Sequence, residues 1–302
     1  MSRSPEGARV FWGGVSLVLI ALVWATTFGI VRSTVSGYAF PPFAFLFWRF
    51  LLASVFGTAY YFPALKGITP RTAWAGFVCG GFLFVGFAGQ TLGLMTIPAA
   101  RSAFLTGLFV LMVPYLAWLT LDRPLETHIV LAAGMAAVGL FFITNPGTDS
   151  LSRGDLYTLL CALGFAGQIV ALEEAGRLAD YRQLFIVQLV TVLVLSGAVM
   201  LWREGFHVPS VNFVWMTIAF TALFATVLAY AVQTWAQQIV PAAETALLLA
   251  LEPVFALFVS AFVYREFFTH LQATGASLIL AAILVVSLVG VPAASSRSAS
   301  ES

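Results

Sequence analysis

The chain has 302 residues, of which 61% are hydrophobic and 9% are charged, whereas an ordinary globular domain carries roughly a quarter charged residues. A water-soluble fold could not bury this much apolar surface, so composition excludes a soluble globular domain. The formal net charge is +1, and no basic patch with interleaved aromatic residues is present, which argues against a nucleic-acid partner.

Long uncharged stretches recur along the chain. Seven of them contain no Asp, Glu, Lys or Arg, and each can cross a hydrocarbon core, which needs about 20 helical residues. They are 10–31, 72–100, 102–121, 127–148, 183–202, 205–243 and 267–296. Three weaker stretches become full spans if each tolerates a charge within it or at its end; these are 33–48 with 50–65, 156–172 and 253–264.

These stretches predict an all-α membrane protein with ten transmembrane helices. The approximate bounds are Trp12–Val31, Phe43–Phe62, Thr72–Met95, Ala99–Leu119, Thr127–Thr144, Leu156–Ala175, Leu184–Trp202, Phe213–Trp235, Ala243–Tyr264 and Leu271–Val291. We expect residues 1–11 to form an N-terminal tail and residues 292–302 a disordered C-terminal tail. The first apolar stretch exceeds the roughly 7–15 residues of a signal-peptide core, so it is interpreted as the first helix.

Lys and Arg in the loops predict the orientation, because loops rich in these residues stay in the cytoplasm. An N-terminus in the cytoplasm places eight of them inside, namely Arg3, Arg9, Lys66, Arg71, Arg123, Arg177, Arg182 and Arg297. Five then lie outside, namely Arg32, Arg101, Arg153, Arg203 and Arg265. This excess predicts that both termini face the cytoplasm of a bacterial inner membrane.

Two ionisable side chains lie inside predicted spans, Arg49 in the second helix and Glu252 in the ninth. Such groups cost about 2.5–3.5 kcal/mol on insertion scales, so they face the protein interior or a wet cavity. Pro253 removes a backbone donor and predicts a helix irregularity beside Glu252. For Glu252 we weigh equally a site for a substrate amine or a coupling proton and a structural anchor. For Arg49 an interhelical pair or a snorkelling side chain is favoured, so Arg49 and Pro253 are assigned structural or gating roles.

Buried glutamines recur in the predicted helices. Gln90 lies in the third helix and Gln233 in the eighth, while Gln168 and Gln188 lie in the sixth and seventh. Because an amide in lipid must find partners, these side chains either tie helices together or line a polar path.

The third helix also has a glycine-rich face. Gly76 and Gly80 are four residues apart, and so are Gly89 and Gly93. This spacing lets another helix approach closely, so Gly89 and Gly93 are expected to serve packing, and such a surface also permits sliding during a conformational change.

The chain contains an internal repeat. Gln90-Thr91 followed by Pro98-Ala99-Ala100 recurs as Gln233-Thr234 followed by Pro241-Ala242-Ala243, at an offset of 143. The two repeats are predicted over 12–144 and 154–291, joined by the linker 145–153. Five helices per repeat is an odd number, so the second repeat enters the membrane upside down relative to the first. Inverted repeats can open a central cavity to alternate sides of the membrane; a chance repeat or a duplicated scaffold is the alternative.

Several short segments carry a resemblance to a known family. They are Leu22-Val23-Trp24-Ala25-Thr26-Thr27-Phe28, Arg49, Gly154-Asp155-Leu156 and, most characteristic, Leu248-Leu249-Ala250-Leu251-Glu252-Pro253-Val254, closed by Arg265-Glu266. In order and spacing the sequence resembles the drug/metabolite transporter superfamily, and within it the EamA-type ten-helix transporters. The resemblance covers nearly the whole chain and does not specify a substrate. The first repeat departs from it, with Phe109-Val110 where the second has Glu252-Pro253.

The resemblance implies a secondary transporter that works by alternating access, with a site formed by helices 1, 3, 4, 6, 8 and 9. Its expected substrate-binding residues are Trp24, Thr27, Gln90, Phe165, Gln168, Gln233 and Glu252, with no cofactor and no metal. Export of amino acids or related small metabolites is the first expectation. Export of drugs, nucleosides or sugars is the alternative, and the oligomeric state stays open. Aromatic cavity walls favour apolar or aromatic-bearing substrates.

Two other classes of protein were weighed. The sequence has no His-Glu-x-x-His motif and no Gly-x-Ser-x-Gly motif, which argues against a membrane-embedded enzyme. A channel is harder to exclude, because a repeat can build a pore as well as a carrier.

Overall fold

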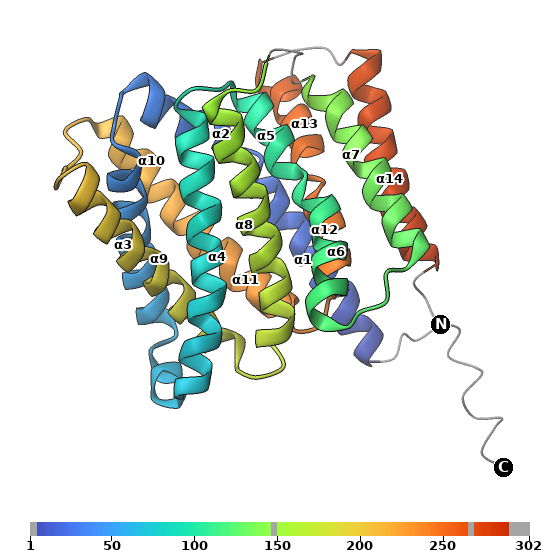
Figure 1. Ribbon diagram of the computed structural model, residues 1–302, viewed down its shortest axis with the longest axis horizontal. Helices are drawn as coiled ribbons and strands as arrows, with labels where there is room; N and C mark the ends of the chain where they lie inside the picture. The colour runs from blue at the N-terminus through green and yellow to red at the C-terminus, as the bar shows by residue number, and fades with distance from the viewer. Residues whose placement is uncertain (1–4, 146–149, 265–268, 290–302) are drawn as a thin grey trace.

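The protein is a bundle of helices that run alongside one another (Figure 1). The computed structural model describes residues 5–145, 150–264 and 269–289, and within these ranges it contains helices and connecting loops without any strand. The expected tail 292–302, the Arg265-Glu266 pair and part of the expected linker 145–153 lie outside the described residues.

The helical segments follow one another with short connections. In the first half they are α1 (Pro5–Trp24), α2 (Thr27–Arg32), the π-helix η1 (Ser33–Gly37), α3 (Pro42–Tyr60), the 3-10 helix η2 (Phe62–Gly67), α4 (Pro70–Leu94), α5 (Ala99–Gly107), α6 (Phe109–Leu121) and α7 (Thr127–Thr144). In the second half they are α8 (Arg153–Ala175), α9 (Tyr181–Arg203), α10 (Asn212–Ala222), the π-helix η3 (Leu223–Leu228), α11 (Ala229–Ala236), α12 (Ala242–Leu249), α13 (Glu252–Tyr264) and α14 (His270–Val289).

Ten helical stretches among the described residues are long and apolar enough to cross a membrane. They are Gly7–Gly37, Pro42–Tyr60, Pro70–Leu94, Ala99–Leu121, Thr127–Thr144, Arg153–Ala175, Tyr181–Arg203, Asn212–Ala236, Ala242–Val259 and His270–Leu288. This number confirms the predicted all-α architecture with ten spans. The first helix starts earlier than predicted, at Pro5, within the segment expected as a tail.

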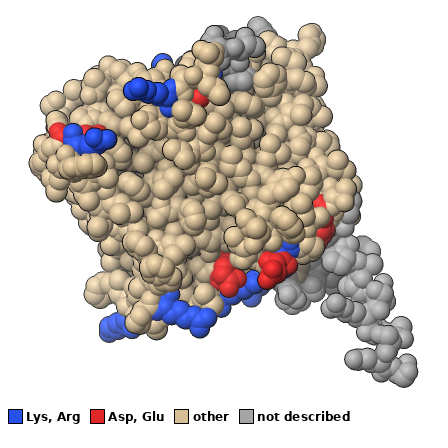
Figure 2. All heavy atoms as spheres, viewed as in Figure 1, with Lys and Arg blue, Asp and Glu red and all other residues tan. Residues whose placement is uncertain are grey.

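Charged side chains gather at the two ends of the bundle. On the face shown in Figure 2, Lys, Arg, Asp and Glu lie along the upper and lower rims, and a broad uncharged belt separates them. Large apolar side chains exposed within the candidate spans include Leu19, Val55, Leu131 and Val194. An apolar belt between charged rims is the surface expected of a protein that faces lipid.

Three of the ten spans are interrupted near their middle. Between α1 and α2, the hydroxyls of Thr26 and Thr27 donate hydrogen bonds to the carbonyl oxygens of Val23 (2.8 Å) and Trp24 (2.9 Å). Threonine side chains that bond backbone carbonyls in this way compete with the regular helix pattern. The α1–α2 break therefore follows from the local sequence.

The other two breaks fall at matching places in the two halves. α5 ends at Gly107 and α6 begins at Phe109, whereas α12 ends at Leu249 and α13 begins at Glu252. We predicted from the sequence that Pro253 causes the irregularity beside Glu252. The break between α12 and α13 instead comes before Glu252, and Pro253 lies in the first turn of α13. A proline is tolerated there because its missing N–H has no helical partner in any case.

The backbones of α4 and α8 touch through glycines. A Cβ atom added at Gly89 would meet the backbone of Tyr157 and Cys161, and one added at Gly93 would meet Thr158 and the carbonyl oxygen of Gly154. α4 also packs on α9, α3 packs on α9, and α1 packs on α11 and α12, while α7 and α14 form a pair at one side of the bundle (Figure 1). Helices of the two halves therefore meet throughout the core.

Candidate functional site

A cavity of about 50 Å³ lies between helices of both halves. It is lined by Trp24, Thr27, Arg49, Phe87, Gln90, Thr106, Phe109, Phe165, Gln168, Ile169, Tyr230, Gln233, Leu249 and Glu252. A water molecule needs about 10–15 Å³ measured in this way, so the cavity has room for only a few waters.

The lining follows the internal repeat. Twelve of the residues form six pairs, each with one member from either half: Trp24 with Phe165, Thr27 with Gln168, Phe87 with Tyr230, Gln90 with Gln233, Thr106 with Leu249, and Phe109 with Glu252. The offset is 141 residues for the first two pairs and 143 for the others. Corresponding positions of the two repeats therefore face one shared space.

The structure brings all seven expected substrate-binding residues together on this cavity, namely Trp24, Thr27, Gln90, Phe165, Gln168, Gln233 and Glu252. Arg49 lines it as well, so the second helix joins the six that the resemblance implied. Pro253 lines an adjoining cavity of about 30 Å³ that shares Glu252, and Gly89 and Gly93 lie in the α4–α8 contact instead. Substrate binding by these residues stays a prediction.

Three aromatic residues of the lining, Phe87, Phe109 and Tyr230, were not predicted from the sequence. Phe87 and Tyr230 each lie three residues before a glutamine that was predicted, Gln90 and Gln233. Residues three apart share a helix face, and both aromatics obey the same repeat offset. The repeated pattern of an aromatic residue three positions before a glutamine was the signal that could have found them.

Arg49 is buried, and its partners are neutral oxygens of the π-helix η3. Its Nε donates to Oγ1 of Thr226 (2.8 Å) and its Nη2 to the carbonyl oxygen of Ala225 (3.4 Å). Its Cζ lies 4.4 Å from the ring centroid of Phe87, a cation–π arrangement. No carboxylate of the described residues lies within ion-pair distance of Arg49, whose guanidinium group lines the cavity.

The π-helix explains why a carbonyl is available to Arg49. π-helical turns shift backbone hydrogen bonds away from the α pattern and often occur at functional sites. The carbonyl oxygen of Ala225 accepts both from Arg49 and from Nε1 of Trp24 (2.9 Å). The hydroxyl of Thr226 donates to the carbonyl oxygen of Thr221 (2.9 Å), five residues earlier.

The carboxyl group of the cavity belongs to Glu252. This residue begins α13 directly after the helix break and lines the cavity. Within the described ranges its carboxylate has no hydrogen-bond or ion-pair partner. A carboxylate in this setting gains most from a cationic or protonated group that enters the cavity.

A chain of amides closes one wall of the cavity. Nε2 of Gln168 donates to Oε1 of Gln188 (3.2 Å), and Nε2 of Gln233 donates to Oε1 of Gln168 (3.2 Å). Nε2 of Gln233 also donates to Oε1 of Gln237 (2.9 Å). The chain links α8, α9 and α11, so these glutamines both tie helices together and border the cavity.

Aromatic rings form the apolar walls. Trp24 and Tyr230 have ring centroids 5.3 Å apart, and Phe87 lies 5.8 Å from Tyr230 and 5.5 Å from Phe165. Trp24 and Phe165 also pack against both large hydrophobic clusters of the protein. The cavity thus combines a guanidinium group, a carboxyl group, amides and aromatic faces.

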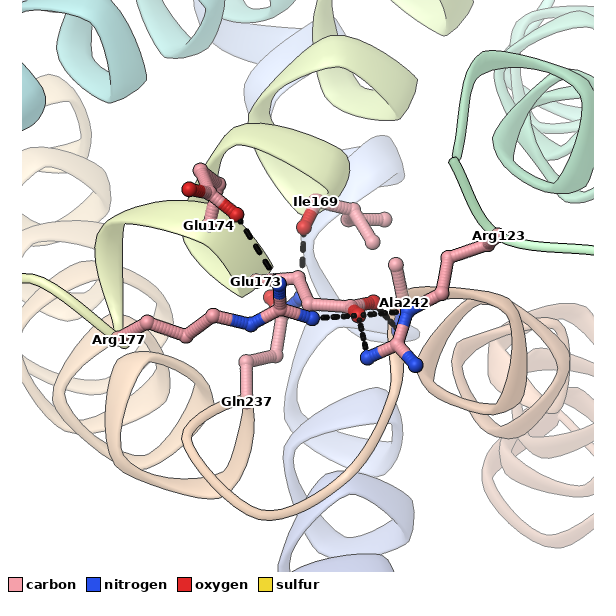
Figure 3. A network of polar contacts seen from close by, with 7 residues as sticks. All are labelled: Arg123, Ile169, Glu173, Glu174, Arg177, Gln237 and Ala242. Carbon is pink, nitrogen blue, oxygen red and sulfur yellow. Dashed lines mark hydrogen bonds and ion pairs between the residues drawn. The ribbon is translucent and has the colours of Figure 1, made fainter. Parts of the chain in front are cut away.

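A polar network ties three segments together at one end of the bundle (Figure 3). Oε1 of Glu173 accepts from Nε (2.9 Å) and Nη2 (2.6 Å) of Arg123 and from Nη2 of Arg177 (3.2 Å). Its Oε2 accepts from the backbone N–H of Ala242 (2.8 Å), at the start of α12. Glu173 therefore acts as an N-terminal cap for a helix far away in the sequence.

A second ion pair lies near the other end of α8. Nε and Nη2 of Arg101 donate to Oδ1 (2.6 Å) and Oδ2 (3.0 Å) of Asp155. Asp155 also forms a capping box with Ser152. Asp155 and Glu173 are separated by about 27 Å along α8, at 1.5 Å per residue, so the two networks lie on opposite sides of the cavity.

The described ranges contain no group of three or more His, Cys, Asp or Glu side chains placed to hold a metal ion. The two cysteines, Cys79 and Cys161, are free and buried. The expectation of no metal and no cofactor stays a prediction.

Comparisons with known proteins agree with this architecture. The model of the EamA-like transporter family matches the chain twice, over residues 11–145 and 152–288. A protein of Archaeoglobus fulgidus that is named an uncharacterized transporter is 32% identical over 284 residues, which cover 94% of this chain and 88% of that protein. A protein of known crystal structure matches with a TM-score of 0.74 and 18% identity over 95% of this chain and 99% of its own; at that identity the likeness concerns the fold alone.

Proposed function

Because the chain belongs to the EamA-like transporter family, and is therefore a multi-pass membrane transporter, we propose that it moves amino acids or related small metabolites by alternating access. The central cavity is the proposed binding site. Net export is the proposed direction, across a bacterial inner membrane with both termini in the cytoplasm. Export is proposed because the sequence resembles the EamA-type transporters, for which export of small metabolites is the expected function.

One observation supports the substrate class: the cavity places a guanidinium group and a carboxyl group, neither of them in an ion pair within the described ranges, between aromatic walls. Arg49 offers N–H donors to a carboxylate, and Glu252 offers a carboxylate to an ammonium group. The rings of Trp24, Tyr230 and Phe165 offer an apolar surface to a side chain. An α-amino acid with an apolar side chain carries these three groups, whereas a sugar carries no charge.

The small volume of the cavity supports a carrier over a channel. A ligand pocket typically measures about 300–1,000 Å³, so a metabolite binds only after helices separate. The networks of Glu173 and of Arg101 with Asp155 tie helices on opposite sides of the cavity. Breaking one while the other holds would open the cavity to one side at a time.

The proposed conformational change uses the repeat. Each family match contains five of the ten spans, and an odd number implies that the two repeats cross the membrane in opposite senses. Two such repeats can exchange conformations around a shared site. The paired lining of the cavity supports this arrangement, because equivalent positions of both repeats face it.

Counterflow in proteoliposomes tests the proposal. Vesicles loaded with unlabelled phenylalanine should take up labelled phenylalanine faster than unloaded vesicles, and the initial rate should saturate with concentration. Flux that rises linearly, without stimulation from the other side, would indicate a channel. Uptake and exchange of nucleosides or sugars in preference to amino acids would move the protein to the alternative substrate class.

A further inference from the structure

The glutamine chain has a fixed direction at the cavity, because backbone carbonyls anchor both of its ends. At one end, Nε2 of Gln237 donates to the carbonyl oxygen of Ile169 (2.8 Å). A carbonyl can only accept, so Oε1 of Gln237 is the atom that faces Gln233. Oε1 also only accepts, and therefore Gln233 must present its Nε2.

The Gln188 end of the glutamine chain fixes the same direction independently. The hydroxyl of Thr234 donates to the carbonyl oxygen of Tyr230 (2.6 Å) and accepts from Nε2 of Gln188 (2.8 Å). Oε1 of Gln188 consequently accepts from Gln168, whose own Oε1 is left to accept from Gln233. Rotating the amide of Gln233 by a half turn would bring its oxygen against two other acceptors.

Gln233 therefore donates both N–H groups of its amide to other glutamines, Gln168 and Gln237, and its own Oε1 is left as an unpaired acceptor. Its Oε1 is buried and has no hydrogen-bond partner in the described part of the protein. The side chain is 1% exposed and lines the cavity. An unsatisfied buried acceptor is costly, and a ligand with an N–H donor removes that cost.

We infer that Oε1 of Gln233, together with the carboxylate of Glu252, binds the primary ammonium group of the substrate. This inference rests on the proposed function and makes Gln233 a specificity-determining residue. Its repeat counterpart Gln90 makes no side-chain hydrogen bond to the described residues and can present either end of its amide. The two halves thus contribute differently: the second half holds an oriented acceptor and a carboxylate, and Arg49 of the first half holds the cation.

An oriented acceptor selects strongly against ligands that lack a donor, because binding them leaves the acceptor unpaired. Hydrogen bonds to charged groups contribute about 1.5–3 kcal/mol, which corresponds to an affinity ratio of about 10- to 150-fold. We expect that ratio between phenylalanine and 3-phenylpropionate, which has the ring and the carboxylate without the amine. Phenethylamine, which lacks the carboxylate, probes the same acceptor without Arg49.

The experiment measures the dissociation constants of these three compounds for the full-length protein in detergent. In the wild type, phenylalanine should bind at least about 10-fold more tightly than 3-phenylpropionate. Equal affinity for the two compounds overturns the inference without any variant. Counterflow of an amine-free metabolite, with no binding of phenylalanine or phenethylamine, would overturn it while leaving a carrier in place.

Two variants separate recognition from structure. Gln233→Met should lower the affinity for phenylalanine and phenethylamine about 10-fold or more and leave 3-phenylpropionate unchanged. Gln188→Met removes a member of the same chain that does not line the cavity, so it should lower the unfolding temperature and keep the ratio between phenylalanine and 3-phenylpropionate. An equal loss for all three compounds in Gln233→Met would show a purely structural residue and overturn the inference.

Discussion

Arg49 and Trp24 donate hydrogen bonds to one and the same atom, the carbonyl oxygen of Ala225, at 3.4 and 2.9 Å. The two side chains come from α3 and α1 of the first half, and the carbonyl belongs to η3 of the second half. Two helices of one repeat are therefore bonded to an irregular turn of the other, directly beside the cavity.

Arg49→Lys should weaken this junction although it keeps the charge. A lysine ammonium lacks the planar fork that reaches Thr226 and the carbonyl oxygen of Ala225 together. We expect the free energy of unfolding to fall by about 1–3 kcal/mol, together with a loss of affinity for substrates that carry a carboxylate. Thermal unfolding and ligand titration measure the two effects. Arg203→Lys, at the exposed end of α9, is the matched control and should change neither quantity.

Glu252→Gln tests whether this carboxylate carries the coupling proton. Glutamine has nearly the same shape and cannot titrate, so the variant should fold, bind amine substrates less tightly, and transport with a rate that no longer depends on pH. Counterflow and uphill uptake driven by a pH gradient, measured between pH values of roughly 5 and 8, would show the difference. A pH profile that matches the wild type would remove Glu252 from proton coupling and leave it as a substrate contact or a structural anchor.

Gly89→Ala should destabilise the protein, because the added Cβ would meet the backbone of α8 at Tyr157 and Cys161. Backbone atoms cannot move aside as a side-chain tip can, so we expect a cost of about 1–3 kcal/mol. Gly81→Ala, on the same helix, has nothing within 4 Å of the added atom and should be neutral or slightly stabilising. Equal unfolding temperatures for the two variants would contradict the close α4–α8 contact.

Glu173→Gln should loosen the network at its end of the bundle. The neutral amide loses the charge-assisted bonds to Arg123 and Arg177, at a cost of about 1.5–3 kcal/mol. We therefore expect the cavity to open more often toward that side of the membrane. The thiol introduced by Leu249→Cys, in a background with Cys79→Ala and Cys161→Ala, should then react several-fold faster with a membrane-impermeant maleimide added from that side.

Glu174→Gln is the control for this variant. Glu174 lies next to Glu173 and pairs only with Arg177 through an exposed contact of 3.3 Å, and exposed ion pairs contribute little. Its labelling rate should equal that of the parent. Faster labelling from both sides in Glu173→Gln would point to general loosening of the protein instead of a gate.

The amino-acid sequence alone determined the ten spans and the internal repeat, and together with the family resemblance it predicted the seven residues that line the cavity. Hydropathy and repeat offsets depend on the order of residues along the chain, and polar groups in a lipid-facing sequence must turn inward. These rules suffice to place Gln90, Gln233 and Glu252 near the protein interior without knowledge of their partners, whereas the resemblance to the EamA-type transporters pointed to Trp24 and Phe165.

The tertiary structure decided which partner each polar group found. Arg49 meets Ala225 across 176 residues of sequence, and Glu173 meets Ala242 across 69. Such pairings depend on how each helix is rotated about its own axis. The glycine contacts between α4 and α8 and the π-helix η3 help to set these rotations. The rotation of a helix about its axis is set by the helices packed against it, so the sequence of a single helix does not reveal it. The unpaired Oε1 of Gln233 could therefore be identified only from the packed arrangement of α8, α9 and α11.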